Sequence, residues 1–139
     1  MKKQWKILVV DDDLSISRSY QKYLESEGYA VFTAHNGKEG LERIEEHTPD
    51  LVLLDINMPV MTGIELLEHL NKTKKKKMPL IIMLTAYGDL DAAVRSTRLG
   101  AYDFLTKPVS LEKLRLMVKR GIEKVAFTEH VAHIIEEDE

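Results

Sequence analysis

Five polar residues stand where four short apolar runs of the chain end. Asp11 and Asp12 follow one run, Asp55 and Thr85 close two others, and Lys107 follows a fourth. Carboxylates drawn into one pocket repel each other by about 4 kcal/mol per pair at ~4 Å and an effective dielectric near 20. A hard divalent cation offsets that repulsion, and carboxylate oxygens suit Mg²⁺. These residue types therefore predict a magnesium site beside a lysine and a hydroxyl.

Such a site could transfer a phosphoryl group. Metal, ammonium and hydroxyl together can cover its three outer oxygens, and the Asp55 carboxylate would be the nucleophile that forms an aspartyl phosphate. Each residue alone has a plainer explanation, since an Asp after a strand is most often a turn former, and Asp11 or Asp13 could cap the next helix. Five suitable groups at four strand ends favour the phosphoryl-transfer interpretation.

The elements that must position these groups alternate along the chain. Apolar runs predict strands at 6–10, 30–34, 51–54, 80–84 and 101–106. Amphipathic segments between them predict helices at about 14–27, from 36, from 62, at about 89–99 and from 111. Right-handed crossovers place helices on both faces of a parallel sheet. The predicted fold class is α/β, a doubly wound five-stranded parallel sheet with five helices, the last one extended.

Capping patterns support several of the helix starts. Asn36 with Glu39 and Thr62 with Glu65 have the spacing of capping boxes, and Ser110 is placed to cap the last helix.

Composition and charge argue against several classes of protein. The 139 residues carry a net charge of −3, which gives no basic footprint for nucleic acid, and they include no cysteine for a disulfide or thiolate site. No apolar stretch approaches a membrane span or a signal-peptide core. We expect a cytoplasmic protein of one domain, with the basic run 74–77 in a solvated loop.

The motifs resemble the receiver domain of bacterial two-component response regulators, over about residues 5–124. The motifs are Ile-Leu-Val-Val-Asp-Asp-Asp at 7–13, Leu-Leu-Asp-Ile-Asn-Met-Pro-x-Met-x-Gly at 53–63, Leu-Thr-Ala at 84–86 and Gly-Ala-Tyr-Asp-Phe-Leu-Thr-Lys-Pro at 100–108. The resemblance implies the flavodoxin-like strand order 2-1-3-4-5. It also implies two-component signalling, with Asp55 accepting phosphate from a sensor histidine kinase or phosphotransfer protein.

The resemblance further assigns the metal ligands. Asp12, Asp55 and the backbone carbonyl of Asn57 would bind Mg²⁺ directly, and Asp11 would act through water. Asn57 and Tyr87 would tune the lifetime of the aspartyl phosphate. We expect the Tyr87 ring to restrict the approach of water and slow hydrolysis.

The resemblance also implies a conformational switch. Lys107, Thr85 and the backbone of Ala86 would contact the phosphoryl group, and the bond from Lys107 to Pro108 would be cis. Thr85 would move toward the phosphoryl group as Phe104 turns inward, which shifts the population between two packings. Phe104 stands where Tyr is commoner, so any hydrogen bond made by the phenolic OH is missing.

A helical extension follows the part of the chain that carries the resemblance. Residues 1–124 are predicted to form the receiver domain and 125–139 an extension, in which Phe127, Val131, Ile134 and Ile135 form an apolar stripe. The extension either packs back on the domain or frays, or it pairs with a second chain as a connector or dimerisation helix. Gly121 weakens the helix by ~1 kcal/mol and suggests a hinge.

Two functional classes remain at this point. The first is a phosphoacceptor switch, a non-enzyme that catalyses its own phosphorylation and dephosphorylation, acts alone or as an input module, and dimerises when phosphorylated. The second is a Mg²⁺-dependent phosphohydrolase with Asp55 as nucleophile, although Asn57 stands where such an enzyme needs a second acid/base carboxylate. A nucleotide or flavin site lacks its glycine loop, and direct DNA binding lacks a helix-turn-helix segment.

Overall fold

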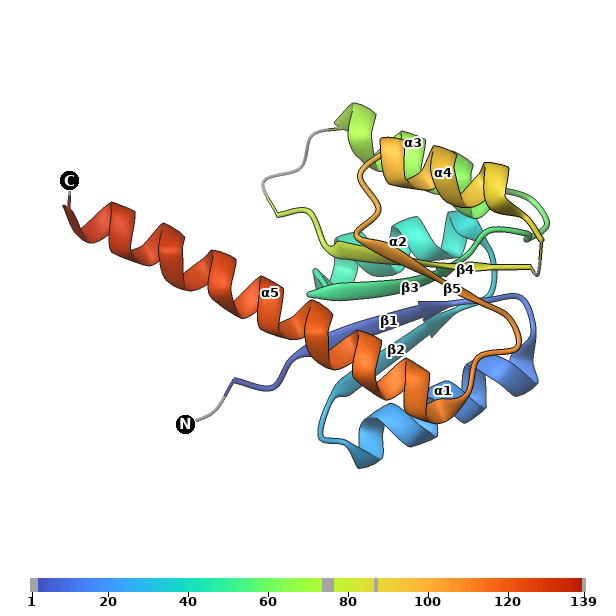
Figure 1. Ribbon diagram of the computed structural model, residues 1–139, viewed down its shortest axis with the longest axis horizontal. Helices are drawn as coiled ribbons and strands as arrows, with labels where there is room; N and C mark the ends of the chain where they lie inside the picture. The colour runs from blue at the N-terminus through green and yellow to red at the C-terminus, as the bar shows by residue number, and fades with distance from the viewer. Residues whose placement is uncertain (1–2, 74–76, 87, 139) are drawn as a thin grey trace.

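A parallel β-sheet forms the centre of the computed structural model, which describes residues 3–73, 77–86 and 88–138. Within those residues the sheet has five strands in the order β2-β1-β3-β4-β5 (Figure 1). The strands are β1 (Lys6–Val10), β2 (Ala30–Ala34), β3 (Leu51–Asp55), β4 (Leu80–Thr85) and β5 (Asp103–Thr106). The strand order implied by the family resemblance is therefore confirmed.

Helices cover both faces of this sheet, as the doubly wound prediction required. They are α1 (Leu14–Ser26), α2 (Gly37–His47), α3 (Gly63–Thr73), α4 (Leu90–Arg98) and α5 (Leu111–Asp138). Helices α1 and α5 lie on one face, and α2, α3 and α4 lie on the other (Figure 1). None of these described helices is long and apolar enough to cross a membrane.

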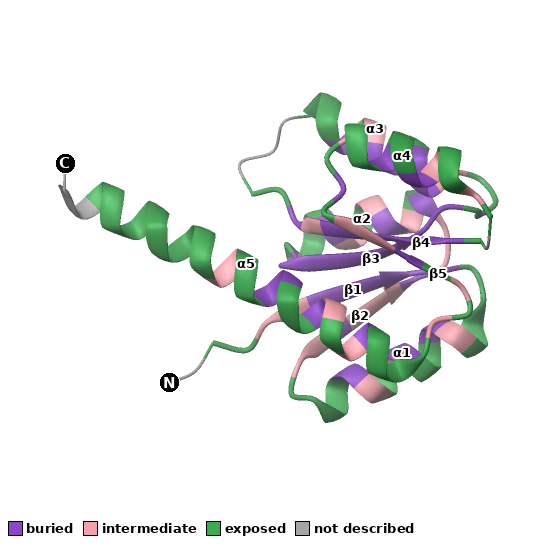
Figure 2. Ribbon diagram, viewed as in Figure 1, coloured by how far each residue is buried: buried purple, intermediate pink, exposed green. Residues whose placement is uncertain are grey.

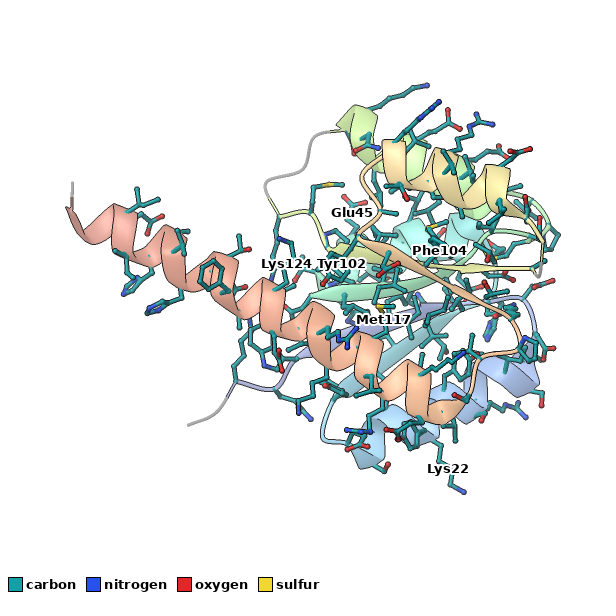
Figure 3. All side chains as sticks on the ribbon, in the orientation of Figure 1. Lys22, Glu45, Tyr102, Phe104, Met117 and Lys124 are labelled. Carbon is teal, nitrogen blue, oxygen red and sulfur yellow. The ribbon has the colours of Figure 1, made fainter. Side chains whose placement is uncertain are left out.

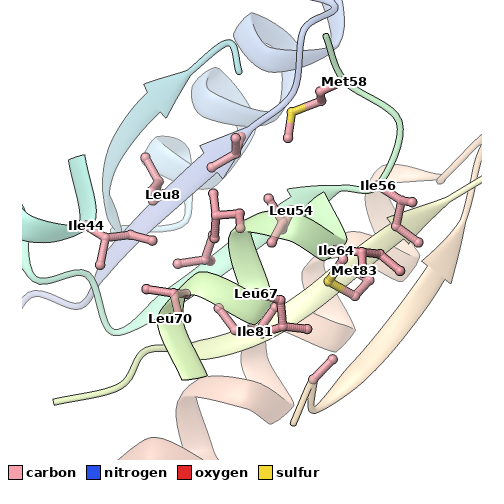
Figure 4. Packing of buried hydrophobic residues seen from close by; sticks show 14 of the residues in the cluster. Leu8, Ile44, Leu54, Ile56, Met58, Ile64, Leu67, Leu70, Ile81 and Met83 are labelled. Atoms are coloured by element: carbon pink, nitrogen blue, oxygen red, sulfur yellow. The ribbon is translucent and has the colours of Figure 1, made fainter. Parts of the chain in front are cut away.

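Strand β3 is the most deeply buried element. It pairs with β1 on one side and β4 on the other, and its four apolar residues have no exposed surface (Figure 2). Val52 and Leu54 face the apolar cluster under α2, α3 and α4, where Leu67, Leu70 and Met83 pack around them (Figure 4). Leu51 and Leu53 face the cluster under α1 and α5. This two-sided burial explains a run of apolar residues without alternation.

Strand β5 is shorter than predicted, because it begins at Asp103 and not at residue 101. The amide of Ala101 donates to the Ser96 carbonyl at 3.0 Å, and that of Gly100 to Thr97 at 3.0 Å. With Gly100 at φ +99, these bonds form a left-handed cap on α4. Ala101 therefore still belongs to the end of the helix, and pairing with β4 starts after it.

The two predicted capping boxes have different outcomes. Thr62 and Glu65 exchange both bonds, with the Glu65 amide 3.2 Å from Thr62 Oγ1 and the Thr62 amide 3.3 Å from Glu65 Oε1. Asn36 accepts from the Glu39 amide at 2.8 Å. The Glu39 carboxylate, however, lies 3.5 Å from His35 Nδ1. The box at Asn36 is thus half formed, because the Glu39 side chain lies toward His35 and not toward the Asn36 amide.

Helix α5 continues without a break through Gly121, so the predicted hinge is wrong. Gly121 is buried, and a Cβ built on it would lie 2.6 Å from Leu51 Cδ1 and 3.2 Å from Leu80 Cδ2. Its neighbours Val118 and Ile122 are also buried. The glycine lets the helix approach the sheet closely, which the propensity argument did not anticipate.

The apolar stripe of the extension lies away from the sheet. Phe127 is nine residues beyond the fully buried Val118, about two and a half turns at ~3.6 residues per turn, so the two side chains point in opposite directions. The stripe residues are 36% to 69% exposed: Phe127, Val131, Ile134 and Ile135. These four side chains therefore do not pack back on the domain.

Candidate functional site

The strand ends that carry the predicted site residues meet at one edge of the sheet. In the parallel register Val10 pairs with Leu54, Asp55 with Leu84, and Thr85 with Thr106. The residues that close or follow these strands therefore lie side by side, on the side of the sheet opposite to the two chain termini (Figure 1). This is the edge where open parallel sheets bind ligands.

Three carboxylates converge at this edge. Asp11, Asp12 and Asp55 each place one oxygen within 4.8 Å of the others. Asp11 is fully buried, Asp55 is 5% exposed, and Asp12 is open to solvent. Buried carboxylates with an exposed one at the mouth form an all-oxygen donor set, which suits a hard cation that keeps part of its water shell. The residues present therefore fit Mg²⁺.

Lys107 bridges the two buried carboxylates. Its Nζ lies 2.9 Å from Asp11 Oδ2 and 3.3 Å from Asp55 Oδ2. One ammonium thus faces two buried anions, and the cluster keeps an excess of negative charge. A bound cation would reduce that excess.

The pKa of Asp55 reflects this imbalance. Burial and the neighbouring Asp11 carboxylate raise it to about 6, against the smaller lowering effects of Lys107 and of the Asn57 amide hydrogen bond. Burial lowers the pKa of Lys107, but its two carboxylate partners together hold it above its ordinary value. The lysine is therefore charged at neutral pH, while Asp55 is held as an anion against a free-energy penalty.

Two of the three acidic residues after β1, Asp11 and Asp13, have different roles. Asp13 accepts hydrogen bonds from the amides of Ser15 at 3.0 Å and Ile16 at 3.2 Å, and so caps α1. Asp11 accepts from the Asp13 amide at 2.9 Å, which orients its carboxylate toward Lys107. The plainer explanation, a helix cap, thus holds for Asp13, whereas Asp11 lies in the cluster.

Thr85 and Lys107 are joined through the backbone. The Lys107 amide donates to the Thr85 carbonyl at 2.7 Å, and the peptide bond from Lys107 to Pro108 is cis, as the resemblance implied. Thr85 is 2% exposed, and its hydroxyl lies 3.5 Å from the Leu105 carbonyl, at the limit of a hydrogen bond. This hydroxyl is weakly held.

The remaining predicted residues lie around this cluster. Phe104 is half-buried against the apolar cluster under α2, α3 and α4 (Figure 3). Ala86 and Lys107 border a cavity of about 580 Å³ that also touches α1 and the start of α5. Asn57 is exposed in the loop after β3. Tyr87 lies outside the described residues, so its predicted role stays a prediction.

Gly63 closes the loop that follows Asp55. Its amide donates to the Ile56 carbonyl at 2.9 Å, and a Cβ at this position would lie 2.3 Å from the Asp55 carbonyl oxygen. Only glycine allows the helix α3 to begin so close to the end of β3. The sequence motif contained this glycine, but its spacing gave no sign of the backbone that it approaches.

Comparison with known proteins identifies the class. The family model of the response regulator receiver domain matches residues 7–119. The chain is 42% identical over 123 residues to the transcriptional regulatory protein ZraR of Klebsiella oxytoca, covering 88% of this chain and 27% of that protein. It is 42% identical over 116 residues to the DNA-binding transcriptional regulator NtrC of Escherichia coli (strain K12), covering 84% and 24%.

A solved structure agrees with these sequence matches. The signal receiver domain of a LuxO repressor protein from Vibrio parahaemolyticus superposes with a TM-score of 0.86 at 29% identity, covering 93% of this chain and 98% of that one. The chain therefore belongs to the response regulator receiver family of two-component systems. It spans about a quarter of the length of the curated relatives that it matches.

Proposed function

We propose that the chain is a phosphorylation-dependent switch whose phosphoacceptor is Asp55. The main support for this proposal is the position of Asp55 Oδ2, which lies 3.3 Å from Lys107 Nζ inside the three-carboxylate cluster. The Asp55 oxygen would form a bond to phosphorus as the P–N bond of a donor phosphohistidine breaks, and the imidazole would keep the electron pair. The donor is a sensor histidine kinase or a phosphotransfer protein, and the setting is cytoplasmic.

Mg²⁺ is the proposed cofactor. Asp12, Asp55 and the Asn57 carbonyl would hold it directly, and Asp11 would act through water. Lys107 Nζ lies closer to Asp11, at 2.9 Å, than to Asp55, at 3.3 Å, which supports this division. When bound, the metal neutralises charge on the transferring phosphoryl group. Lys107 would hold one phosphoryl oxygen, and Thr85 with the Ala86 amide would hold another.

The switch is proposed to couple Thr85 to Phe104. The weak contact of the Thr85 hydroxyl supports its release toward a phosphoryl group. The ring of Phe104 is only half-buried, so the switch can bury more of its surface. Asn57 and Tyr87 are proposed to set the lifetime of the phosphate. A Tyr87→Glu variant should lose phosphate faster than the parent protein.

The extension at 125–139 is proposed to be a connector or a dimerisation helix that pairs chains when Asp55 is phosphorylated. Its exposed stripe, on the face opposite to the sheet, supports this role. The two sequence relatives are named as transcriptional regulators, whereas the sequence of this chain predicts no helix-turn-helix segment. Its output would therefore pass through a partner or a further domain and not through direct contact with nucleic acid.

Light-scattering mass after size exclusion tests the proposal, with and without Mg²⁺ and beryllofluoride, a mimic of the aspartyl phosphate. We expect beryllofluoride to change Trp5 or Tyr fluorescence and to shift monomer toward dimer, and Asp55→Asn to abolish both effects. If beryllofluoride binds without causing dimerisation, only the proposed role of the extension is contradicted. Absence of binding would overturn the phosphoacceptor assignment, and multiple-turnover phosphate release from a phosphomonoester would favour the hydrolase.

A further inference from the structure

A further buried carboxylate, besides Asp11 and Asp55, lies at the opposite edge of the sheet. The side chain of Asp50, immediately before β3, is 1% exposed and takes no part in the phosphoacceptor site. It accepts a hydrogen bond from the Lys6 amide at 2.9 Å and ion pairs from Lys77 at 2.9 Å and Lys3 at 3.4 Å. This carboxylate fixes the positions of two lysines from distant parts of the chain.

The same two lysines contact helix α5. Lys3 Nζ lies 3.4 Å from both carboxylate oxygens of Glu129, and Lys77 Nζ lies 3.9 Å from Glu129 Oε1. Lys77 is the described member of the basic run 74–77, whose other residues lie outside the described part. Lys77 is exposed in the turn before β4, in agreement with the expectation of a solvated loop, and its ammonium in addition pairs with Asp50 and Glu129.

Apolar packing of α5 against the sheet ends before Glu129. Ile122 is the last buried side chain among the described residues of the helix, and Glu129 follows it by seven residues, about 10 Å along the axis. Between them, a groove of about 420 Å³ separates the helix from the segment before β4, with Met78, Tyr102 and Lys124 among its lining residues. Side-chain packing therefore does not close this gap, and the ion pairs span it.

We propose that Asp50, Lys3, Lys77 and Glu129 form an ionic clasp that fixes the direction of the α5 extension relative to the sheet. Asp50 is buried and needs its cationic partners, so the lysines stay in place. Glu129 is 44% exposed and can lose its charge without leaving a buried ion unpaired. The clasp orients the apolar stripe, and it does so independently of phosphorylation at Asp55.

The chain contains no cysteine, so the direction of the extension can be measured with two introduced spin labels. Lys22→Cys on α1, whose side chain points into solvent in Figure 3, and Ala132→Cys on the extension are both exposed. Double electron–electron resonance then reports the distribution of distances between body and extension. The charge change is Glu129→Gln, which keeps the shape of the side chain.

A matched control is Glu136→Gln, two turns further along the same helix. Glu136 is exposed, and it has no ion pair with any residue in the described part of the chain. We expect Glu129→Gln to broaden the distance distribution at least about twofold, and Glu136→Gln to leave it unchanged. Salt of about 1 M, where the Debye length is ~3 Å, should broaden the parent distribution and leave that of Glu129→Gln as it is.

Three outcomes would overturn the clasp. They are an unchanged distribution in Glu129→Gln, equal broadening by both variants, and a parent distribution insensitive to salt. Circular dichroism of each variant verifies that α5 keeps its helix content, because loss of helix would also broaden the distances and would count against the clasp. Beryllofluoride binding serves as an independent check, since the clasp can fail while the phosphoacceptor assignment holds.

Discussion

The two ends of strand β3 carry the same residue type in opposite electrostatic situations. Asp55 at the carboxyl end shares one lysine with Asp11, and burial with that like charge raises its pKa to about 6. Burial alone would also raise the pKa of Asp50, but the Lys6 amide with Lys77 and Lys3 outweighs burial and holds it below its ordinary value. At the Asp55 end two buried carboxylates share one lysine, whereas at the other end the single carboxylate of Asp50 pairs with two lysines. The difference separates a cluster whose anions exceed their cationic partners from a carboxylate whose charge is fully paired.

Neutralising Asp55 should remove this difference between the two ends and give the largest change in stability. The rise in pKa from 3.8 to about 6 corresponds to roughly 3 kcal/mol against the folded anion. We therefore expect Asp55→Asn to raise the free energy of unfolding by up to about 3 kcal/mol at pH 7 without metal, as measured by urea denaturation. A raised folded pKa makes the parent protein lose stability as the pH rises from about 4 to 6.

The gain from Asp55→Asn should therefore vanish below pH 4, where the carboxyl is protonated in both states. Added Mg²⁺ should stabilise the parent protein at pH 7 and leave Asp55→Asn nearly unchanged. A gain that is the same at every pH would show that the charge is not its cause.

The same substitution at the other end should have the opposite sign. Asp50→Asn leaves Lys3 and Lys77 without their buried anion, and we expect a loss of about 1–3 kcal/mol at pH 7. A lowered folded pKa gives stability that is present above the unfolded pKa and is lost as the pH falls through the folded one. Urea denaturation should thus show a loss that shrinks in acid. Stabilisation by Asp50→Asn would contradict the contrast between the two ends.

Packing of α5 against the Asp50 end of β3 predicts a smaller change in stability. The added methyl group of Gly121→Ala meets the fully buried Leu51, and overpacking of about 1–3 kcal/mol exceeds the ~1 kcal/mol gain in helix propensity. We expect a net loss of about 1 kcal/mol in urea denaturation. A net gain of that size would mean that α5 is loosely held there.

Backbone strain in the loop after Asp55 gives the smallest expected effect. Val60 has φ +71 and is 80% exposed, and the Met61 amide bonds to the Pro59 carbonyl around it at 2.8 Å. The hydrogen bond between residues 59 and 61 closes a γ-turn of positive φ, in which a β-branched residue is strained by about 1–3 kcal/mol and glycine is not. Because glycine also makes the unfolded chain more flexible, Val60→Gly should add only about 0.5–1 kcal/mol of stability by thermal unfolding. No gain would place the strain elsewhere in the loop.

Local patterns in the sequence predicted most of the fold and the residue types of the site. The apolar run of β3 and the glycine stops depend on near neighbours, so a single sequence contains them. The sharing of Lys107 between Asp11 and Asp55 depends on which strands are neighbours, and the family resemblance supplied that strand order. Gly121 and the clasp at Asp50 depend on contacts between segments far apart in the chain. Those contacts have no period or spacing by which a sequence could show them.

The continuous helix α5 converts residue number into direction. Because each residue turns a helix by ~100°, one residue inserted between Ile122 and Phe127 would swing the apolar stripe by more than a quarter turn, while seven would nearly restore it. Any sequence joined to this receiver through α5 therefore inherits a rotational phase as well as a distance. Fusions that preserve this phase should present the stripe as the natural helix does, and those that shift it by one or two residues should point it elsewhere.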